Sequence, residues 1–275
     1  MSAESEARDA AEAFRADHHL GLQPIGDLVA VIEETCGVDV CLLPQGDEAH
    51  GMTVRHGHTT IVGVITTAHP MRQRSTLAHE LAHVLFDDLT GGGPERRWAA
   101  RSPEEVRADA FARHLLVPIG AVRERVVERE VDERLVSDLV QAFGASPKIV
   151  AIQLREAGVI DYDLYDDWSR LTAPSLATKF GWQAAYRAMR QQSESMRPPQ
   201  GLLRRATAAY AEGVVSVALL ARLNGTHDID GTRRELDEAG IVPKAFDVVW
   251  PSRPEPTSAS LTSDEVDTLL SDLDD

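Results

Sequence analysis

The chain has 275 residues, 43% of them hydrophobic, which is enough for one large domain or two modest domains with a real core. Its 44 acidic and 28 basic residues give a formal charge of −16, so the surface as a whole repels nucleic-acid phosphates and anionic membranes. No apolar run approaches the ~20 residues that span a bilayer, and the first residues lack a signal-peptide pattern. Cys36 and Cys41 form no CxxC pair. These features predict a cytoplasmic protein with free thiols.

The first part of the chain predicts two helices followed by a small sheet. Residues 7–17 and 25–36 carry apolar residues at helical spacing. The pattern then changes to runs of β-branched and apolar residues, which predict strands at 38–43, 52–55 and 59–67.

The next segment carries an HExxH motif, with His79, Glu80 and His83 in the defined positions. On a helix the two histidines lie at i and i+4, so both imidazoles leave one face and can bind one metal ion. Apolar neighbours make a solvated helix the weaker interpretation, because buried histidine and glutamate side chains need partners. Glu80 lies about 100° round the helix from His79, where it would contact a water molecule at the metal.

A catalytic zinc site needs a third protein ligand, and the helix that follows Ser102 offers two candidates. Ser102 is a helix N-cap, Pro103 takes the first helical position, and Glu105 completes a capping box. Glu105 shares a face with small apolar residues, so we expect its carboxylate to face inward as the third ligand. Asp109 is the alternative ligand, or an acceptor for a ligand imidazole. Glu105 acting only as a capping side chain is the competing interpretation.

Two segments together resemble the ImmA/IrrE-type zinc metallopeptidases. Residues 76–83 are similar to that family's TLAHELGH core, and residues 105–118 are similar to its ExxAxxFAxxLLxP signature. The sequence departs from the family pattern at three positions, none of them a ligand: Ser75, Ala82 and His114. The resemblance covers about residues 8–160 and implies a zincin-like, gluzincin-like fold that uses Zn²⁺. It implies that His79, His83 and Glu105 bind the zinc and that Glu80 is the catalytic base.

The rest of the chain is predicted to be almost wholly helical. Residues 135–157 and 202–240 each have a helix–turn–helix outline, and for both we expect packing or partner binding rather than DNA contact. A single helix is predicted at 176–196. Residues 252–275 carry seven acidic residues against one arginine and are expected to be disordered. Their last part has an apolar stripe that suits folding on a protein partner.

The sequence therefore predicts an α+β, mainly helical chain with a zincin-like domain and a three-stranded sheet at 1–160, a helical domain at 161–251 and an acidic tail at 252–275. The expected function is zinc-dependent endopeptidase activity on a specific regulatory protein, such as a helix–turn–helix transcriptional repressor, which is the substrate class that the resemblance implies. Candidates for a second oxyanion donor are His114, Arg96 and Arg97. The alternative is a catalytically silent, partner-binding or DNA-binding transcriptional regulator with a structural zinc. No membrane partner is expected, and direct DNA binding is not favoured.

Overall fold

The computed structural model describes residues 2–44, 51–57, 59–88 and 102–244. The predicted acidic tail and the candidates Arg96 and Arg97 lie outside these ranges. The first half of the chain forms α1 (Ala3–Asp17), α2 (Leu28–Cys36), β1 (Asp39–Leu43), β2 (Gly51–His56), β3 (Thr59–Ile65), α3 (Pro70–Phe86) and α4 (Pro103–Leu116). It continues through α5 (Ile119–Val126), α6 (Glu133–Phe143), α7 (Pro147–Glu156), α8 (Tyr162–Ser169), α9 (Ala173–Phe180), α10 (Gln183–Ser193), α11 (Gln200–Ala211), α12 (Val217–Leu223) and α13 (Ile229–Glu238). The predicted α+β, mainly helical class is confirmed.

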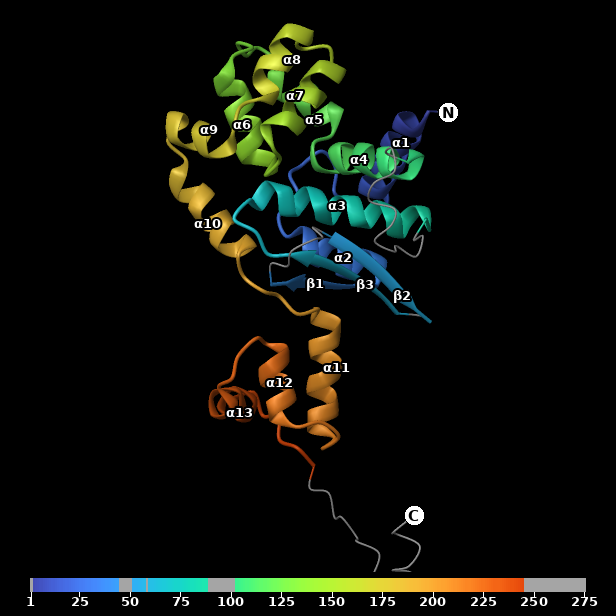
Figure 1. Cartoon of the computed structure of the whole chain (residues 1–275), viewed down its shortest axis with the longest axis vertical. Coiled ribbons are helices and arrows are strands. Elements are labelled where there is room, and N and C mark those ends of the chain that lie inside the picture. The colour runs from blue at the N-terminus through green and yellow to red at the C-terminus, as the bar shows by residue number, and fades with distance from the viewer. Residues whose placement is uncertain (1, 45–50, 58, 89–101, 245–275) are drawn as a thin grey trace, which may run out of the picture.

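The three predicted strands form one sheet in the order β1-β3-β2, with β1 parallel and β2 antiparallel to β3 (Figure 1). Val62 and Val64 of β3 are buried on the core face of this sheet. The register pairs Thr53 of β2 with Val62, so Thr53 lies on the same face, which α3 covers. In the described chain the outer edge of β2 is paired with no strand, whereas Leu42 at the edge of β1 pairs with Arg197.

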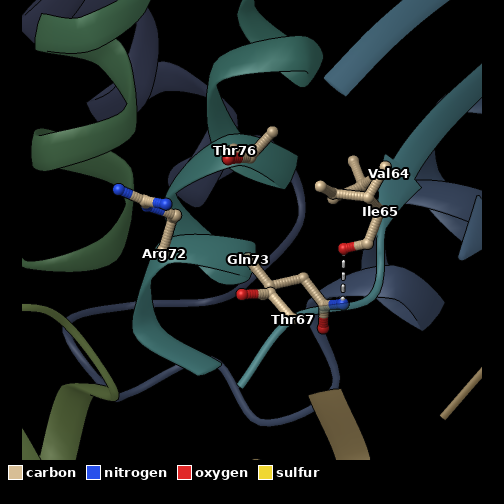
Figure 2. A pocket seen from close by; sticks show the side chains of 6 residues that line it. All are labelled: Val64, Ile65, Thr67, Arg72, Gln73 and Thr76. Atoms are coloured by element: carbon tan, nitrogen blue, oxygen red, sulfur yellow. Dashed lines mark hydrogen bonds between the residues drawn. The ribbon is translucent and has the colours of Figure 1, made fainter. Parts of the chain in front are cut away.

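Gln73 fixes the first turn of α3 against the sheet. Its amide nitrogen donates to the backbone oxygen of Ile65, 3.1 Å away at the end of β3 (Figure 2). The same nitrogen donates to the backbone oxygen of Ser193, 3.0 Å away at the end of α10. The cavity beside it has a volume of about 10 Å³, which is room for about one water molecule. This anchor sets the position of α3, and therefore of the HExxH motif, relative to the strands.

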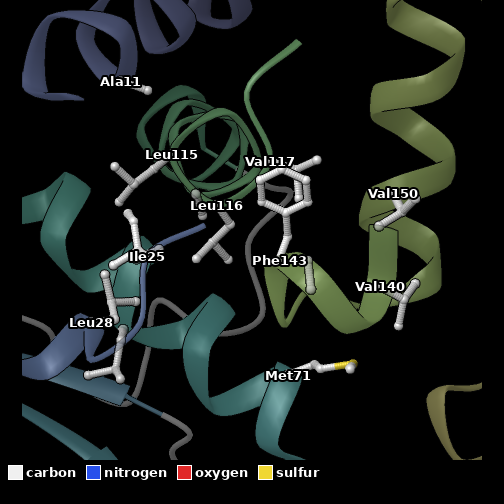
Figure 3. Packing of buried hydrophobic residues seen from close by; sticks show 14 of the residues in the cluster. Ala11, Ile25, Leu28, Met71, Leu115, Leu116, Val117, Val140, Phe143 and Val150 are labelled. Atoms are coloured by element: carbon white, nitrogen blue, oxygen red, sulfur yellow. The ribbon is translucent and has the colours of Figure 1, made fainter. Parts of the chain in front are cut away.

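A continuous hydrophobic core extends from α1 to α10. Figure 3 shows its centre, where Leu115 and Leu116 of α4 pack among side chains of α2, α3 and α6. Trp168, Leu176 and Trp182, beyond residue 160, belong to this same core. A second, smaller cluster lies in α11 and α12 and consists of Ala206, Tyr210, Val217 and Leu220. The domain division expected at residue 160 stays a prediction.

The predicted helix–turn–helix unit at 135–157 is present as α6 and α7, which are bent by 111°. Gly144 ends α6 with a φ of 58°, a left-handed conformation that suits glycine. Much of α7 is turned into the core, since Val150, Ala151 and Leu154 are fully buried. This burial agrees with the packing role that we expected for the unit.

The single helix predicted at 176–196 is wrong in one respect. Gly181, with a φ of 83°, ends α9, and the chain continues as α10 after Trp182. Trp182 is buried and its indole nitrogen donates to the hydroxyl of Ser137 at 2.9 Å. The tryptophan thus joins this break to α6. Among the described helices, no single one is long and apolar enough to cross a membrane. The bent pair α6–α7 reaches the required length and apolar composition only when its two helices are taken together.

Candidate metal centre

Three of the predicted site residues bring their side-chain donor atoms together between α3 and α4. The Nε2 atoms of His79 and His83 lie 3.1 Å apart. Oε2 of Glu105 lies 3.2 Å from Nε2 of His79, and Oε1 lies 3.6 Å from Nε2 of His83. The structure therefore places the third candidate, from the start of α4, directly opposite the HExxH face of α3.

These separations fit a zinc ion. Tetrahedral coordination with bonds of about 2.0–2.1 Å sets ligand atoms about 3.3 Å apart. The three observed separations bracket this value. At these separations the donor atoms turn their electron pairs toward one another. A divalent cation at the centre satisfies all three groups at once.

The second ring nitrogen of each histidine contacts a carboxylate. Nδ1 of His79 lies 3.0 Å from Oδ1 of Asp109, and Nδ1 of His83 lies 2.7 Å from Oδ1 of Asp88. An ionised carboxylate only accepts hydrogen bonds, so both Nδ1 atoms carry the proton and both Nε2 atoms present a lone pair. This is the tautomer that a metal-binding imidazole requires. Asp109 thus takes the acceptor role that we gave as an alternative to ligation.

The electrostatics of the site favour positive charge at His79. Burial lowers the pKa of this imidazole, but the hydrogen bond and charge of Asp109, with the charges of Glu105 and Glu80, outweigh it and hold the pKa above its usual value. A group of carboxylates that stabilises an imidazolium also stabilises a bound cation, so a proton and a metal ion compete for this place.

Glu80 lies beside this cluster and faces the sheet. The residue is 8% exposed, and its Oε2 accepts a 2.7 Å hydrogen bond from the hydroxyl of Thr53 on β2. At Gly51 the strand passes so close that an added Cβ would lie 2.6 Å from Oε1 of Glu80. The carboxylate is therefore confined between α3 and β2, on the side of the motif that the sequence predicted for the base.

His114, which we considered as a second oxyanion donor, is placed elsewhere. It is 3% exposed, and its Nε2 contacts Glu4 of α1 at 2.8 Å. The amide nitrogen of Gln153 donates to Val117 at 2.6 Å and also faces Nδ1 of His114 at 3.2 Å, so Nδ1 is an acceptor. Nε2 then carries the proton and donates to Glu4. The geometry of Glu4, His114 and Glu156 resembles a metal site, but in this tautomer the imidazole donates to Glu4, so the group is a hydrogen-bond cluster.

The candidate centre is open to solvent. The large hollow of about 450 Å³ between the starts of α2 and α3 and the ends of α6 and α10 is a separate feature, since the three donor residues are not part of its lining. At the centre itself the Glu105 side chain is 52% exposed, whereas those of His79 and His83 are 19% and 14% exposed. Such an open site suits a segment of a macromolecule better than an enclosed small molecule.

Sequence reasoning missed two residues of this site. Asp88 follows the motif helix, and the only signal for it was an acidic residue five positions after His83. Thr53 was assigned to a strand, but nothing in the sequence gave the register that turns it toward Glu80. Both contacts depend on how separate elements meet.

The arrangement of an HExxH helix, a carboxylate from a following helix and an adjacent small sheet defines the zincin-like class of metallopeptidases. Residues 33–155 match the family model described as Peptidase_M78, IrrE N-terminal-like domain. This segment contains the whole candidate centre, and the resemblance to the ImmA/IrrE family is confirmed. The domain is thus of metallopeptidase type. A search of curated proteins gives no significant match.

Proposed function

We propose that this chain is a zinc-dependent endopeptidase. The observation that carries the proposal is the convergence of His79, His83 and Glu105, with Glu80 confined beside them. The family match supports it, because a peptidase needs both a metal site and a base. The donor set of two imidazoles and one carboxylate leaves a fourth position for water, as catalytic zinc sites do.

In this proposal His79, His83 and Glu105 hold the zinc. When bound, zinc supplies a Lewis acid and brings the pKa of its water toward ~7. Glu80 accepts a proton from the attacking water and then delivers it to the nitrogen of the leaving amine. Thr53 keeps Oε2 of Glu80 in place through its hydrogen bond and so orients the carboxylate for this exchange. The hydrogen bonds from the two Nδ1 atoms keep the imidazoles oriented throughout.

The outer edge of β2 is the proposed binding place for the peptide. Its backbone groups are not paired with another strand of the described chain, and β2 contacts α3 next to the motif. An extended peptide added to this edge would form main-chain hydrogen bonds and cross in front of Glu80. Recognition through the backbone requires no particular side chain, so specificity must come from contacts farther along the substrate.

We propose a specific regulatory protein as the substrate, such as a helix–turn–helix transcriptional repressor, in the cytoplasm. The open site supports a protein substrate, and the family resemblance supports the regulatory class. A protein partner for the acidic tail remains part of the proposal, and no membrane partner is included. Direct DNA binding is not favoured: α7 is largely buried, and α13 carries four acidic residues beside Arg233 and Arg234.

The test compares zinc-loaded wild type with Glu80→Gln in an extract of the source organism. Mass spectrometry of new protein N-termini is the measurement, with metal content and thermal unfolding as controls. We expect both proteins to bind about one zinc per chain and only the wild type to generate new N-termini. If both proteins bind zinc and both samples contain the same N-termini, the proposed peptidase activity is wrong, and a regulator with a structural zinc is favoured.

A further inference from the structure

The chain turns sharply at the end of the motif helix and brings Asp88 back onto it. Asp87 ends α3 with a φ of 52°, a left-handed conformation that reverses the chain direction. Asp88 then lies beside the last turn of the helix, with Oδ1 2.7 Å from Nδ1 of His83. Only 11% of the Asp88 side chain is exposed, so water competes little for this contact.

Arg107 of α4 holds the other oxygen of Asp88. Its Nη2 donates to Oδ2 of Asp88 at 2.7 Å, and its Nη1 donates to Oε1 of Glu6 on α1 at 3.0 Å. The guanidinium also lies over the ring of Phe86, 4.1 Å from the ring centre. These three contacts restrict the Arg107 side chain, and its hydrogen bond in turn fixes the orientation of the Asp88 carboxylate.

We propose that Asp88 and Arg107 are positioning residues of the metal centre. Asp88 fixes the tautomer and ring orientation of His83, and Arg107 acts on His83 through Asp88. Helix α4 then orients both motif histidines: Asp109 holds His79 directly, and Arg107 holds His83 through the carboxylate of Asp88. The same helix supplies Glu105, so a shift of α4 would disturb all three donors together. The inference rests on the proposed zinc site.

The test measures zinc affinity by competition with a chromophoric chelator, in the full chain. Asp88→Asn keeps the size of the side chain but removes its charge, so we expect zinc to bind about 10–100-fold more weakly. Asp87→Asn is the matched control, because asparagine also adopts the left-handed conformation and the Asp87 carboxylate contacts Arg55 rather than a histidine. We expect its affinity to stay within about twofold of wild type, since it leaves both imidazoles oriented.

Two further measurements distinguish a positioning role of Asp88 from a purely structural role. Long-range ¹H–¹⁵N NMR of the zinc-free protein reports imidazole tautomers, and Asp88→Asn should change the signals of His83 while leaving those of His79. Arg107→Lys should weaken zinc binding less than Asp88→Asn, and the two substitutions combined should weaken it by less than the product of their separate effects. This second variant keeps the test decisive if Asp88→Asn folds poorly.

The possible failures are distinguishable. Wild-type affinity and an unchanged His83 tautomer in a folded Asp88→Asn would overturn the positioning role and leave the metal site standing. A wild type that binds no zinc would overturn the proposed function itself.

Discussion

The hydroxyl of Thr53 on β2 donates a 2.7 Å hydrogen bond to Oε2 of Glu80 on α3, and so joins the edge strand to the proposed base. Thr53→Val keeps the shape of the side chain and removes this donor. We expect kcat to fall about tenfold, because a lost hydrogen bond to a charged group is worth about 1.5 kcal/mol. Zinc affinity should not change, since Thr53 contacts no donor atom of the metal site.

Thr53→Ser is the matched control, because it restores the hydroxyl without the methyl group. Steady-state kinetics on a substrate identified through its new N-termini would measure kcat and KM separately. A loss confined to KM, or an equal loss in the serine variant, would show that Thr53 contributes to peptide binding or packing instead of positioning Glu80.

Gly51 is the point of closest approach between β2 and the motif helix. A Cβ at this position would lie 2.6 Å from Oε1 of Glu80 and 2.6 Å from Cγ2 of Thr76. We expect Gly51→Ala to displace the carboxylate or the strand, lowering kcat more than Thr53→Val does and lowering the free energy of unfolding by about 1–3 kcal/mol. Gly26→Ala is the control, since nothing lies within 4 Å of the added methyl. Urea unfolding measures the free energy of unfolding of both variants, and steady-state kinetics measure kcat. Wild-type values for Gly51→Ala would show that β2 and Glu80 are not in tight contact at this position.

The parts of the site that follow from local periodicity were predictable from the sequence. The i, i+4 spacing of His79 and His83 requires only a helix, and the capping signals at Ser102 fixed where α4 begins and which way Glu105 faces. The three strands were also predictable, because their β-branched runs contrast with the flanking helices.

Contacts between elements were not predictable in the same way. Thr53 faces Glu80 because β2 pairs with β3 in one register, and a shift of one residue would turn it to the other face. Asp88 reaches His83 because Asp87 adopts a conformation that sequence favours only weakly for aspartate. His114 was one candidate for an oxyanion donor, but its helix position alone does not reveal that it faces α1.

Asp109 makes zinc binding depend on pH. The raised pKa of His79 means that a proton competes with the metal, so zinc affinity should fall as the pH is lowered through that pKa. Asp109→Asn removes the hydrogen-bonded charge and lowers the pKa, so the fall should move to lower pH. Above this range the variant should still bind zinc about 10–100-fold more weakly, because the imidazole is less firmly oriented.

Chelator competition across a pH series measures both effects on one protein. Glu104→Gln is the matched control, because Glu104 is a half-buried acidic neighbour of Glu105 on the same helix whose side chain hydrogen-bonds Ser102 rather than a histidine. If the zinc affinity of Asp109→Asn falls over the same pH range as that of wild type, Asp109 orients His79 without setting its protonation.

Asp27 links the start of α2 to the segment that follows α10. Its Oδ1 accepts from the backbone nitrogen of Ala30 at 3.0 Å, and both oxygens accept from Nη1 of Arg197 at 3.0 and 2.9 Å. Burial raises the pKa of this carboxyl, but the hydrogen bonds from Ala30 and Arg197 and the charge of Arg197 outweigh it and hold the pKa below its usual value. A carboxylate of this kind stabilises the fold above its unfolded pKa of about 3.9, and the contribution is lost as pH falls through the lower folded value.

Asp27→Ala removes the cap and the ion pair together, and we expect it to lower the free energy of unfolding by about 1 kcal/mol at neutral pH. Asp27→Asn keeps the helix cap and loses only the ion pair with Arg197. Because the Asp27 side chain is 46% exposed, this substitution should lower the free energy of unfolding by only about a few tenths of a kcal/mol. Urea unfolding at pH 7 and at pH values stepped down below about 4 separates the two contributions. The difference between wild type and Asp27→Ala should narrow as Asp27 itself becomes protonated and its hydrogen bonds to Ala30 and Arg197 weaken. A difference that stays constant through this range would mean that the carboxylate charge adds nothing, and that the alanine acts only through the lost cap and lost packing.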